Sequence, residues 1–203
     1  MIKKRRVGIY GGTFNPPHNG HVGAAEAFCR DALLDELIIM PDFLPPHKEI
    51  ANSISPIDRL KMCDLAFSHI DKAHVSDMEI KRGGRSYTYI TLEQLTCPDS
   101  DLYFLCGTDM LLTLSEWVRP ERIFELATIC YVRREMDKAT SVLIDKKIAE
   151  YENKYSARII KIAPDEVKVV SSSDLRESLK NNLDIGALPI SVLKYIKEKG
   201  LYK

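Results

Sequence analysis

Short apolar runs alternate with longer amphipathic segments along most of the chain. The short runs are typical of buried strands, and the longer segments carry apolar residues at helical spacing, as Val22, Ala25 and Phe28 do. We expect strands at 5–12, 36–42, 74–80, 101–110, 128–135 and 157–164, with 74–80 at a sheet edge, and helices at 19–34, 55–70, 88–96, 120–127, 172–182 and 189–200.

Alternation of strand and helix predicts a mainly parallel sheet with helices on both faces. We therefore expect a three-layer, Rossmann-like α/β fold in one domain, residues 1–203. Ser55 and Pro56 should open one helix, and Gly200 should end the last. Such sheets bind ligands beyond the carboxyl ends of their strands. The unusual residues fall there, within 11–21, 41–48, 106–110 and, less directly, 163–176.

Composition excludes several classes of protein. Hydrophobic residues make up 45% of the 203 positions, and Lys plus Arg and Asp plus Glu both number 29, so the net charge is zero. We therefore expect no nucleic-acid or membrane partner bound through bulk charge. Five cysteines without a C-x-x-C pair suggest buried thiols rather than a zinc site or disulfide framework. The basic N-terminus is no signal peptide and no run has membrane-spanning length, so we expect a cytoplasmic protein.

The stretch "GGTFNPPHNGH" directly follows the apolar run "RVGIY" of the first predicted strand. Gly11 and Gly12 would permit positive φ and close approach of a ligand to the backbone. A helix beginning near Asn19 would put His18 and His21 on the same side of its start. Free N–H groups, the helix dipole and the imidazoles would then all favour a phosphate. The alternative is a tight turn with two solvated histidines.

The stretch "SSSDLR" predicts a second anion site. Ser172, Ser173 and Asp174 are N-cap candidates, which places Arg176 in the first turn of the helix. A cation there opposes the helix dipole unless it grips an anion such as phosphate. The alternative is an ordinary capped helix with a surface arginine.

Two loops in the middle of the chain are candidates for binding a second substrate. His47 and Lys48 follow the second strand and suit a phosphate, although a solvated turn would look the same. Ser86, Tyr87 and Thr88 open a helix whose free amides could hold a carboxylate.

Asp109 and Trp117 suggest nucleoside contacts. Asp109 is expected at the end of a central strand, where its carboxylate suits a ribose hydroxyl. Trp117, the only tryptophan, precedes a helix and could stack on a flat ring, although tryptophan is more often part of a core.

These motifs carry a family resemblance. "GGTFNPPHNGH" resembles the G-G-T-F-[DN]-P-x-H-x-G-H signature of the nucleotidylyltransferases, and "SSSDLR" resembles their I-S-S-T-x-[IL]-R signature, with Ser173 in place of threonine. Together with "PDFLPPHK", "RGGRSYTYITL", "LCGTDML", "WVRP", "VRRE" and "LPISVLKYIKEKGLY", they resemble the bacterial nicotinate-nucleotide adenylyltransferase family. Membership implies transfer of the adenylyl group of ATP to nicotinate mononucleotide. The products would be nicotinate adenine dinucleotide (deamido-NAD) and pyrophosphate, in NAD biosynthesis, with Mg²⁺ brought by ATP.

The resemblance also implies roles for individual residues. The catalytic residues would be His18, His21 and Arg176. The ATP site would comprise Gly11, Gly12, Thr13, Phe14, His18, His21, Gly107, Asp109, Arg133, Ser172, Ser173 and Arg176. The nicotinate mononucleotide site would comprise His47, Lys48, Ser86, Tyr87, Thr88, Asp109, Trp117 and Val118. Asn15 and Ile90 stand where the family often has aspartate.

Several alternatives stay open. The acceptor could be nicotinamide mononucleotide, phosphopantetheine or a cytidylyl-transfer substrate. A nucleotide-sensing module without turnover, or an RNA-binding protein, would also carry such motifs, although zero net charge disfavours RNA. The sequence does not decide between a monomer and a homo-oligomer.

Overall fold

A parallel sheet forms the centre of the computed structural model, which describes residues 3–45, 54–132, 138–165, 172–181 and 186–203. Its six strands run in the order β3-β2-β1-β4-β5-β6. They are β1 (Arg5–Gly12), β2 (Glu36–Pro41), β3 (Ala73–Val75), β4 (Ser100–Gly107), β5 (Ala127–Val132) and β6 (Ile159–Ile162). Every pair of neighbours is parallel, which confirms the expected Rossmann-like sheet.

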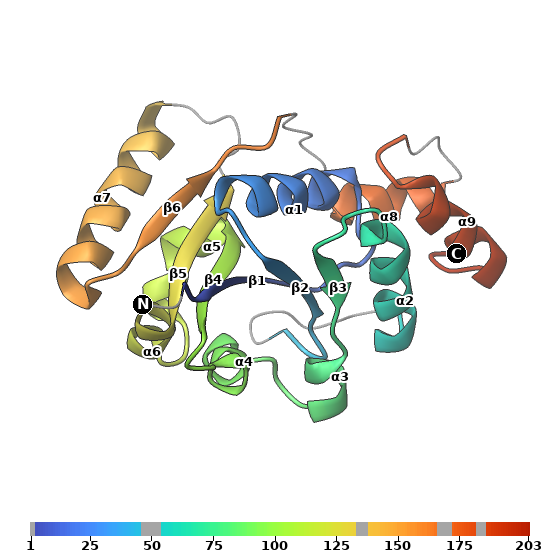
Figure 1. Cartoon of the computed structure of the whole chain (residues 1–203). Helices are drawn as coiled ribbons and strands as arrows, with labels where there is room; N and C mark the ends of the chain where they lie inside the picture. The colour runs from blue at the N-terminus through green and yellow to red at the C-terminus, as the bar shows by residue number, and fades with distance from the viewer. Residues whose placement is uncertain (1–2, 46–53, 133–137, 166–171, 182–185) are drawn as a thin grey trace.

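Helices cover both faces of the sheet (Figure 1). They are α1 (Asn19–Asp31), α2 (Pro56–Phe67), α3 (Met78–Arg82), α4 (Thr88–Leu95), α5 (Thr108–Thr113), the 3₁₀ turn η1 (Leu114–Glu116), α6 (Pro120–Leu126), α7 (Lys138–Tyr155), α8 (Ser172–Lys180) and α9 (Ile190–Lys199). Along β4, Tyr103 and Leu105 join the core formed with α1, α2 and α9. Leu102, Phe104 and Cys106 join the core formed with α4 to α7. This alternation is the two-residue period of a strand buried on both faces, and it produces the three predicted layers.

The predicted helix caps at Ser55 and Gly200 are confirmed. Ser55 caps α2 by accepting a hydrogen bond from the Asp58 N–H at 3.0 Å. Gly200 ends α9 in the left-handed conformation, with φ of 62°.

Two expectations about strands are wrong, and one long helix was not predicted. The strand expected over 74–80 ends at Val75, because Met78 already starts α3. The strand expected over 101–110 ends at Gly107, so Asp109 lies in the first turn of α5 rather than at the end of a strand. The 18-residue α7 follows β5 and was not predicted.

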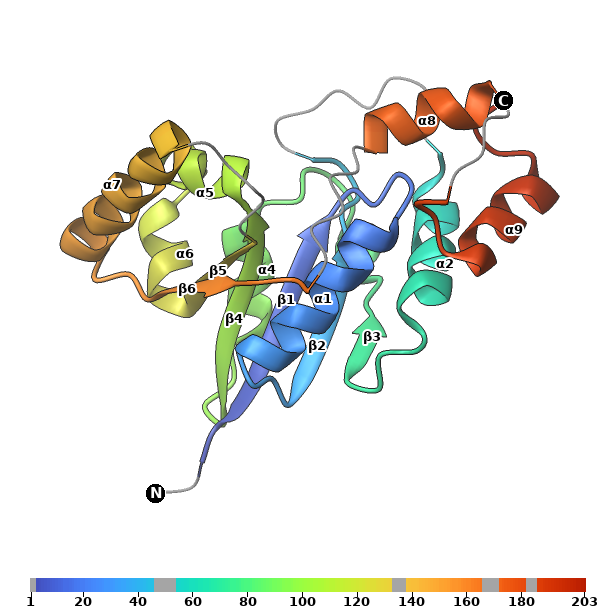
Figure 2. The ribbon, with the colours of Figure 1, turned by 90° about the horizontal axis from the view of Figure 1, so that it is seen from above.

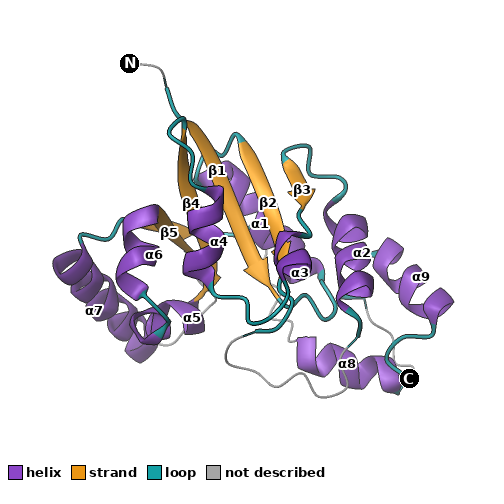
Figure 3. Cartoon of the chain, turned by 90° about the horizontal axis from the view of Figure 1, so that it is seen from below, coloured by secondary structure: helices purple, strands orange, loops and turns teal. Residues whose placement is uncertain are grey.

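The carboxyl ends of the central strands meet at one edge of the sheet. Gly12 of β1 pairs with Pro41 of β2, and Gly107 of β4 pairs with Val132 of β5. The strand order reverses between β1 and β4, which is where ligands bind in open parallel sheets. Helix α8 lies at this edge, and the N-terminus lies at the other end of the molecule (Figures 2 and 3).

The helices and the cysteines can be compared with what the composition predicts. No helix of the described residues has the length and apolar character needed to cross a membrane. Cys63, Cys106 and Cys130 are buried free thiols, as expected. Burial raises the pKa of Cys130 to about 12, so it is protonated at neutral pH.

Candidate active site

The loop after β1 is joined to the end of β2. The Gly12 carbonyl accepts a hydrogen bond from the Asp42 N–H at 3.0 Å, and the Thr13 hydroxyl donates to Asp42 Oδ2 at 2.8 Å. Gly11 and Gly12 do not use the positive φ that glycine permits, because both residues continue β1. The left-handed conformation falls on Phe14 instead, with φ of 47°. A Cβ on Gly12 would lie 3.2 Å from the Phe14 ring, so Gly12 provides space for that ring.

Phe14 supports the loop from inside the protein. It is only 2% exposed, and its ring makes edge contacts with Tyr10, His21 and Phe67 at centroid distances of 5.3, 5.1 and 5.8 Å. Its role in lining the nucleotide cleft stays a prediction. With the ring in the core, the backbone of Phe14 would carry that role.

His18 and His21 lie together at the start of α1, as predicted. His18 is the N-cap residue and is 4% exposed. The two rings stack with centroids 3.7 Å apart and planes at 29°. The His18 N–H donates to His21 Nδ1 at 3.2 Å, so neutral His21 carries its proton on Nε2, which is the nitrogen that can donate to a ligand.

The stacked rings favour a bound anion. Charging both would place two cations 3.7 Å apart at the positive end of a helix dipole. A phosphate would offset that repulsion, and the positive end of the helix dipole also favours it.

The second predicted phosphate motif reaches the same loop from the other end of the chain. Arg176 donates from Nη1 to the Asn15 carbonyl at 2.9 Å and from Nη2 to the Ser173 hydroxyl at 3.0 Å. The Ser172 hydroxyl lies 3.5 Å from the Pro16 carbonyl. The structure therefore brings the predicted residues of α8 beside the loop that leads to His18.

Two details of the α8 prediction are wrong. Because the helix begins at Ser172, the three N-cap candidates Ser172, Ser173 and Asp174 all lie inside its first turn, and none of them is the N-cap. Arg176 lies one position beyond that first turn, and its guanidinium extends back to Ser173.

The segment before α9 also contacts the start of α1. The Asn19 N–H donates to the Ala187 carbonyl at 2.8 Å, and the Asn19 side chain donates from Nδ2 to the Gly186 carbonyl at 3.2 Å. One backbone donor at the helix start is therefore already satisfied by the C-terminal part of the chain.

Ser86 lies inside the loop that was predicted to bind the acceptor. It is 8% exposed, and its hydroxyl accepts from the Phe43 N–H at 3.0 Å and hydrogen-bonds to the carboxyl group of Glu79. Burial raises the pKa of Glu79, while the hydrogen bonds from Thr91 and Ser86 oppose that rise. The Ser86 side chain thus holds the loop together, and Tyr87 and Thr88 open α4 as predicted.

Trp117 and Val118 follow η1 and precede α6 in the chain. The Trp117 ring makes an edge contact with Phe104 at 6.3 Å, and Phe104 in turn lies 3.7 Å from where a Gly11 Cβ would stand. Arg119 lies over the Tyr89 ring of α4 at 5.2 Å. Trp117 is half-buried and Val118 is exposed, and this segment contacts β4 through Trp117 and α4 through Arg119.

His47, Lys48 and Arg133 lie outside the described residues, so their predicted contacts stay predictions. Only the described residues that adjoin them can be placed at the site edge. Leu44 pairs with Arg85, and Val132 pairs with Gly107.

The sequence interpretation missed two buried residues at this edge. Arg59 is 1% exposed, and it precedes the buried Met62 and Cys63 of α2 by three and four positions. An arginine on the apolar face of a helix is a signal that could have been found. The Thr108 hydroxyl donates to the Val132 carbonyl at 2.9 Å and joins the ends of β4 and β5.

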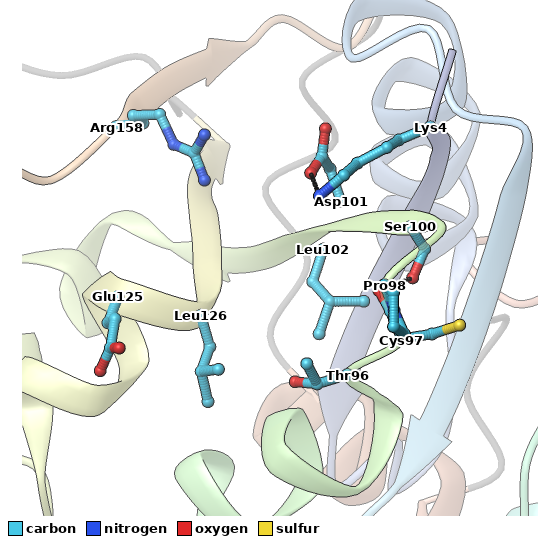
Figure 4. Close-up of a pocket in the computed structure, with 10 residues that line it drawn as sticks. All are labelled: Lys4, Thr96, Cys97, Pro98, Ser100, Asp101, Leu102, Glu125, Leu126 and Arg158. Atoms are coloured by element: carbon cyan, nitrogen blue, oxygen red, sulfur yellow. Dashed lines mark hydrogen bonds and ion pairs between the residues drawn. The ribbon is translucent and has the colours of Figure 1, made fainter. Parts of the chain in front are cut away.

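A separate hollow lies at the opposite end of the sheet, before β4 and β5 (Figure 4). It has a volume of about 340 Å³, and Lys4 and Asp101 at its rim are 3.5 Å apart. None of the predicted site residues lines it. Within the described ranges, no group of three or more His, Cys, Asp or Glu side chains could hold a metal ion.

The geometry agrees with a comparison against known families. The family model described as cytidylyltransferase-like matches residues 9–178, which include both phosphate motifs. This chain belongs to the cytidylyltransferase-like family. The cytidylyltransferase-like match thus confirms the superfamily predicted from "GGTFNPPHNGH" and "SSSDLR".

Relatives within the cytidylyltransferase-like family extend over the whole chain. A protein of Lachnoclostridium phytofermentans named "Probable nicotinate-nucleotide adenylyltransferase" is 40% identical over 98% of this chain and 99% of its own. A protein of Desulfatibacillum aliphaticivorans with the same name is 35% identical over 97% and 99%. The structure of Plasmodium falciparum nicotinic acid mononucleotide adenylyltransferase complexed with APC has a TM-score of 0.74 at 17% identity, covering 98% of this chain and 97% of that one. The structural likeness supports the fold, and the sequence relatives confirm the predicted resemblance.

Proposed function

We propose that this chain, as one nucleotidylyltransferase domain over residues 1–203, transfers the adenylyl group of ATP to nicotinate mononucleotide. The products are nicotinate adenine dinucleotide and pyrophosphate, in a step of NAD biosynthesis. One observation carries the proposal. Arg176 of α8 binds the Asn15 carbonyl at 2.9 Å, so the two phosphate motifs form a single site.

The reaction depends on the positioning of its two substrates and needs no covalent enzyme intermediate. A phosphate oxygen of the acceptor attacks the α-phosphorus of ATP, the bond from that phosphorus to the β-bridging oxygen breaks, and pyrophosphate leaves with the bond's electron pair. His21 donates from Nε2 to an oxygen on the α-phosphate, and His18 adds a second donor. Arg176 neutralises the β- and γ-phosphates as charge builds on the leaving pyrophosphate.

Magnesium enters this proposal as part of the substrate. ATP brings Mg²⁺ on its phosphates, where the ion shields their charge. We also place the reaction in the cytoplasm, where the five free thiols of the chain would stay reduced.

The choice of acceptor rests on two supports. The named relatives carry the activity in their names. The segment of Trp117 also contacts α4 through Arg119, and a flat pyridine ring with its carboxylate would fit between the indole and the helix amides. The proposed partners of the pyridine carboxylate are backbone amides rather than a lysine or arginine, so charge alone does not select the acid over the amide.

Pyrophosphate release tests the proposal directly. The purified chain is given ATP and Mg²⁺ with nicotinate mononucleotide, nicotinamide mononucleotide or phosphopantetheine in turn. Release with the acid form alone supports the proposed acceptor. Release with another acceptor would keep the phosphate site and overturn the acceptor, and ATP binding without any release would indicate a sensing module.

A further inference from the structure

Arg59 occupies a position where a charged side chain is rare. It lies on the inner face of α2 and is 1% exposed, and among the described residues it is one of the largest fully buried side chains. A buried guanidinium must be compensated by hydrogen bonds and an opposite charge. The hydrogen-bond partners of Arg59 therefore indicate its role.

Those partners belong to the loops after β1 and β2. Nη1 donates to the Thr13 carbonyl at 2.7 Å, and Nη2 donates to the Asp42 carbonyl at 2.6 Å and the Phe43 carbonyl at 3.3 Å. Nη1 also lies 3.2 Å from Asp42 Oδ1. The other carboxylate oxygen of Asp42 accepts from the Thr13 hydroxyl at 2.8 Å, which closes a ring of contacts.

The two loops serve different substrates in the proposed reaction. The chain runs from Thr13 into the histidines at the start of α1, which would hold ATP. From Phe43 it runs toward His47 and Lys48, which are predicted to hold the acceptor phosphate. On its other side, Phe43 is held by the Ser86 hydroxyl at 3.0 Å, and the Ser86 N–H donates to the Leu44 carbonyl at 2.9 Å.

We propose that Arg59 is a positioning residue that fixes the spacing between the ATP loop and the acceptor loop. This inference rests on the proposed function, because the distance it sets matters only if both loops hold reacting groups. Arginine suits this position because its planar guanidinium can donate hydrogen bonds to both loops at once, whereas the ammonium of lysine is a single point charge. In-line attack tolerates little displacement, since an error of about 1 Å can cost on the order of 100-fold in rate.

The test compares Arg59→Lys with Lys61→Met, a change at an exposed position of the same helix. Initial rates of pyrophosphate release give kcat and the KM of each substrate, and calorimetry gives the affinity for ATP alone. We expect Arg59→Lys to fold, to bind ATP within about 3-fold of the wild type, and to lose at least about 10-fold in kcat. Lys61→Met should match the wild type. Equal kinetics for the two variants would overturn the proposal.

Amide hydrogen exchange gives a readout that does not need turnover. If Arg59 joins the loops, Arg59→Lys should speed exchange both at 13–21 and at 42–44. Faster exchange within α2 alone would overturn the inference. Should Arg59→Lys not fold, Asp42→Ala carries the same test, because it removes the carboxylate contacts to Thr13 and Arg59 but keeps the backbone carbonyls. A wild type without turnover would refute the proposed function, and the exchange data would still decide the role of Arg59.

Discussion

The hydroxyl of Tyr202, one residue from the C-terminus, donates to Oδ1 of Asn15 at 2.6 Å. Both residues are buried, and burial raises the pKa of the Tyr202 phenol well above its ordinary value, so the hydroxyl stays protonated and remains a donor. The Asn15 carbonyl simultaneously accepts from Arg176. Position 15 therefore requires an acceptor oxygen, which explains in physical terms why asparagine can stand where the family often has aspartate.

Replacing Tyr202 by phenylalanine should destabilise the protein by about 1–2 kcal/mol, because it leaves the buried Oδ1 of Asn15 without its donor. Urea unfolding measures the loss. Tyr103→Phe is the matched control, since Tyr103 is equally buried and its hydroxyl makes no hydrogen bond within the described part of the chain. A loss of the same size in both variants would show that the Tyr202 hydrogen bond contributes nothing specific.

Replacing His21 by alanine should lower kcat by about 10²- to 10³-fold while the protein stays folded, since one donor to the developing charge is removed. Steady-state pyrophosphate release and circular dichroism measure the two effects. His69→Ala serves as the control, because His69 is exposed and pairs with Glu26 on the outside of the helices. Near-normal turnover of His21→Ala would remove His21 from the proposed mechanism.

Replacing Arg176 by lysine should raise the KM for ATP by about 10-fold and lower kcat, with little change in the KM for the acceptor. Lysine cannot keep the two contacts to Asn15 and Ser173 and still face a phosphate. Arg122→Lys is a matched control, because Arg122 also contacts two partners, forming ion pairs with Glu93 and Glu125, but on the surface. A change confined to the KM of the acceptor would contradict the assignment of Arg176 to ATP.

Local patterns were enough to predict most of the fold. The apolar runs gave five of the six strands nearly in place, and capping residues such as Ser55 and Gly200 gave helix ends. The prediction over 74–80 failed because β3 pairs with β2 over only three residues before α3 begins. Helix α7 was missed although Ile144, Ile148 and Tyr151 recur at helical spacing, since charged residues dominate the rest of it.

The site was predictable only where its chemistry is local. The histidines, three positions apart on one helix start, were found because their proximity follows from helical geometry. Contacts between distant segments were not found. Arg59 contacts Thr13 across 46 positions and Tyr202 contacts Asn15 across 187, and these pairings depend on how α2 and the C-terminus pack. Ser86 was predicted to belong to the acceptor site. Its hydrogen bond to the buried carboxyl group of Glu79 was not predicted, because it depends on how α3 packs against the loop before α4.

Glu79 leads to a prediction about pH. Its carboxyl group accepts a hydrogen bond from the Thr91 hydroxyl and lies 3.7 Å from Arg82, yet burial is the largest effect and raises its pKa above the ordinary value of 4.5. The folded protein therefore keeps a proton at pH values where the unfolded chain has lost it. Stability due to this group is present below pH 4.5 and falls as pH rises through the raised pKa of the folded state.

The Glu79→Gln variant isolates that contribution. Glutamine keeps oxygen and nitrogen atoms for hydrogen bonds to Thr91 and Ser86 but does not ionise. The free energy of unfolding of the wild type minus that of Glu79→Gln should be greatest at about pH 4 and should decrease toward neutral pH. Urea unfolding at several pH values measures this difference, and the other carboxylates cancel in it. A difference that grows with pH would mean that Arg82, 3.7 Å away, outweighs burial and that Glu79 is held as a carboxylate.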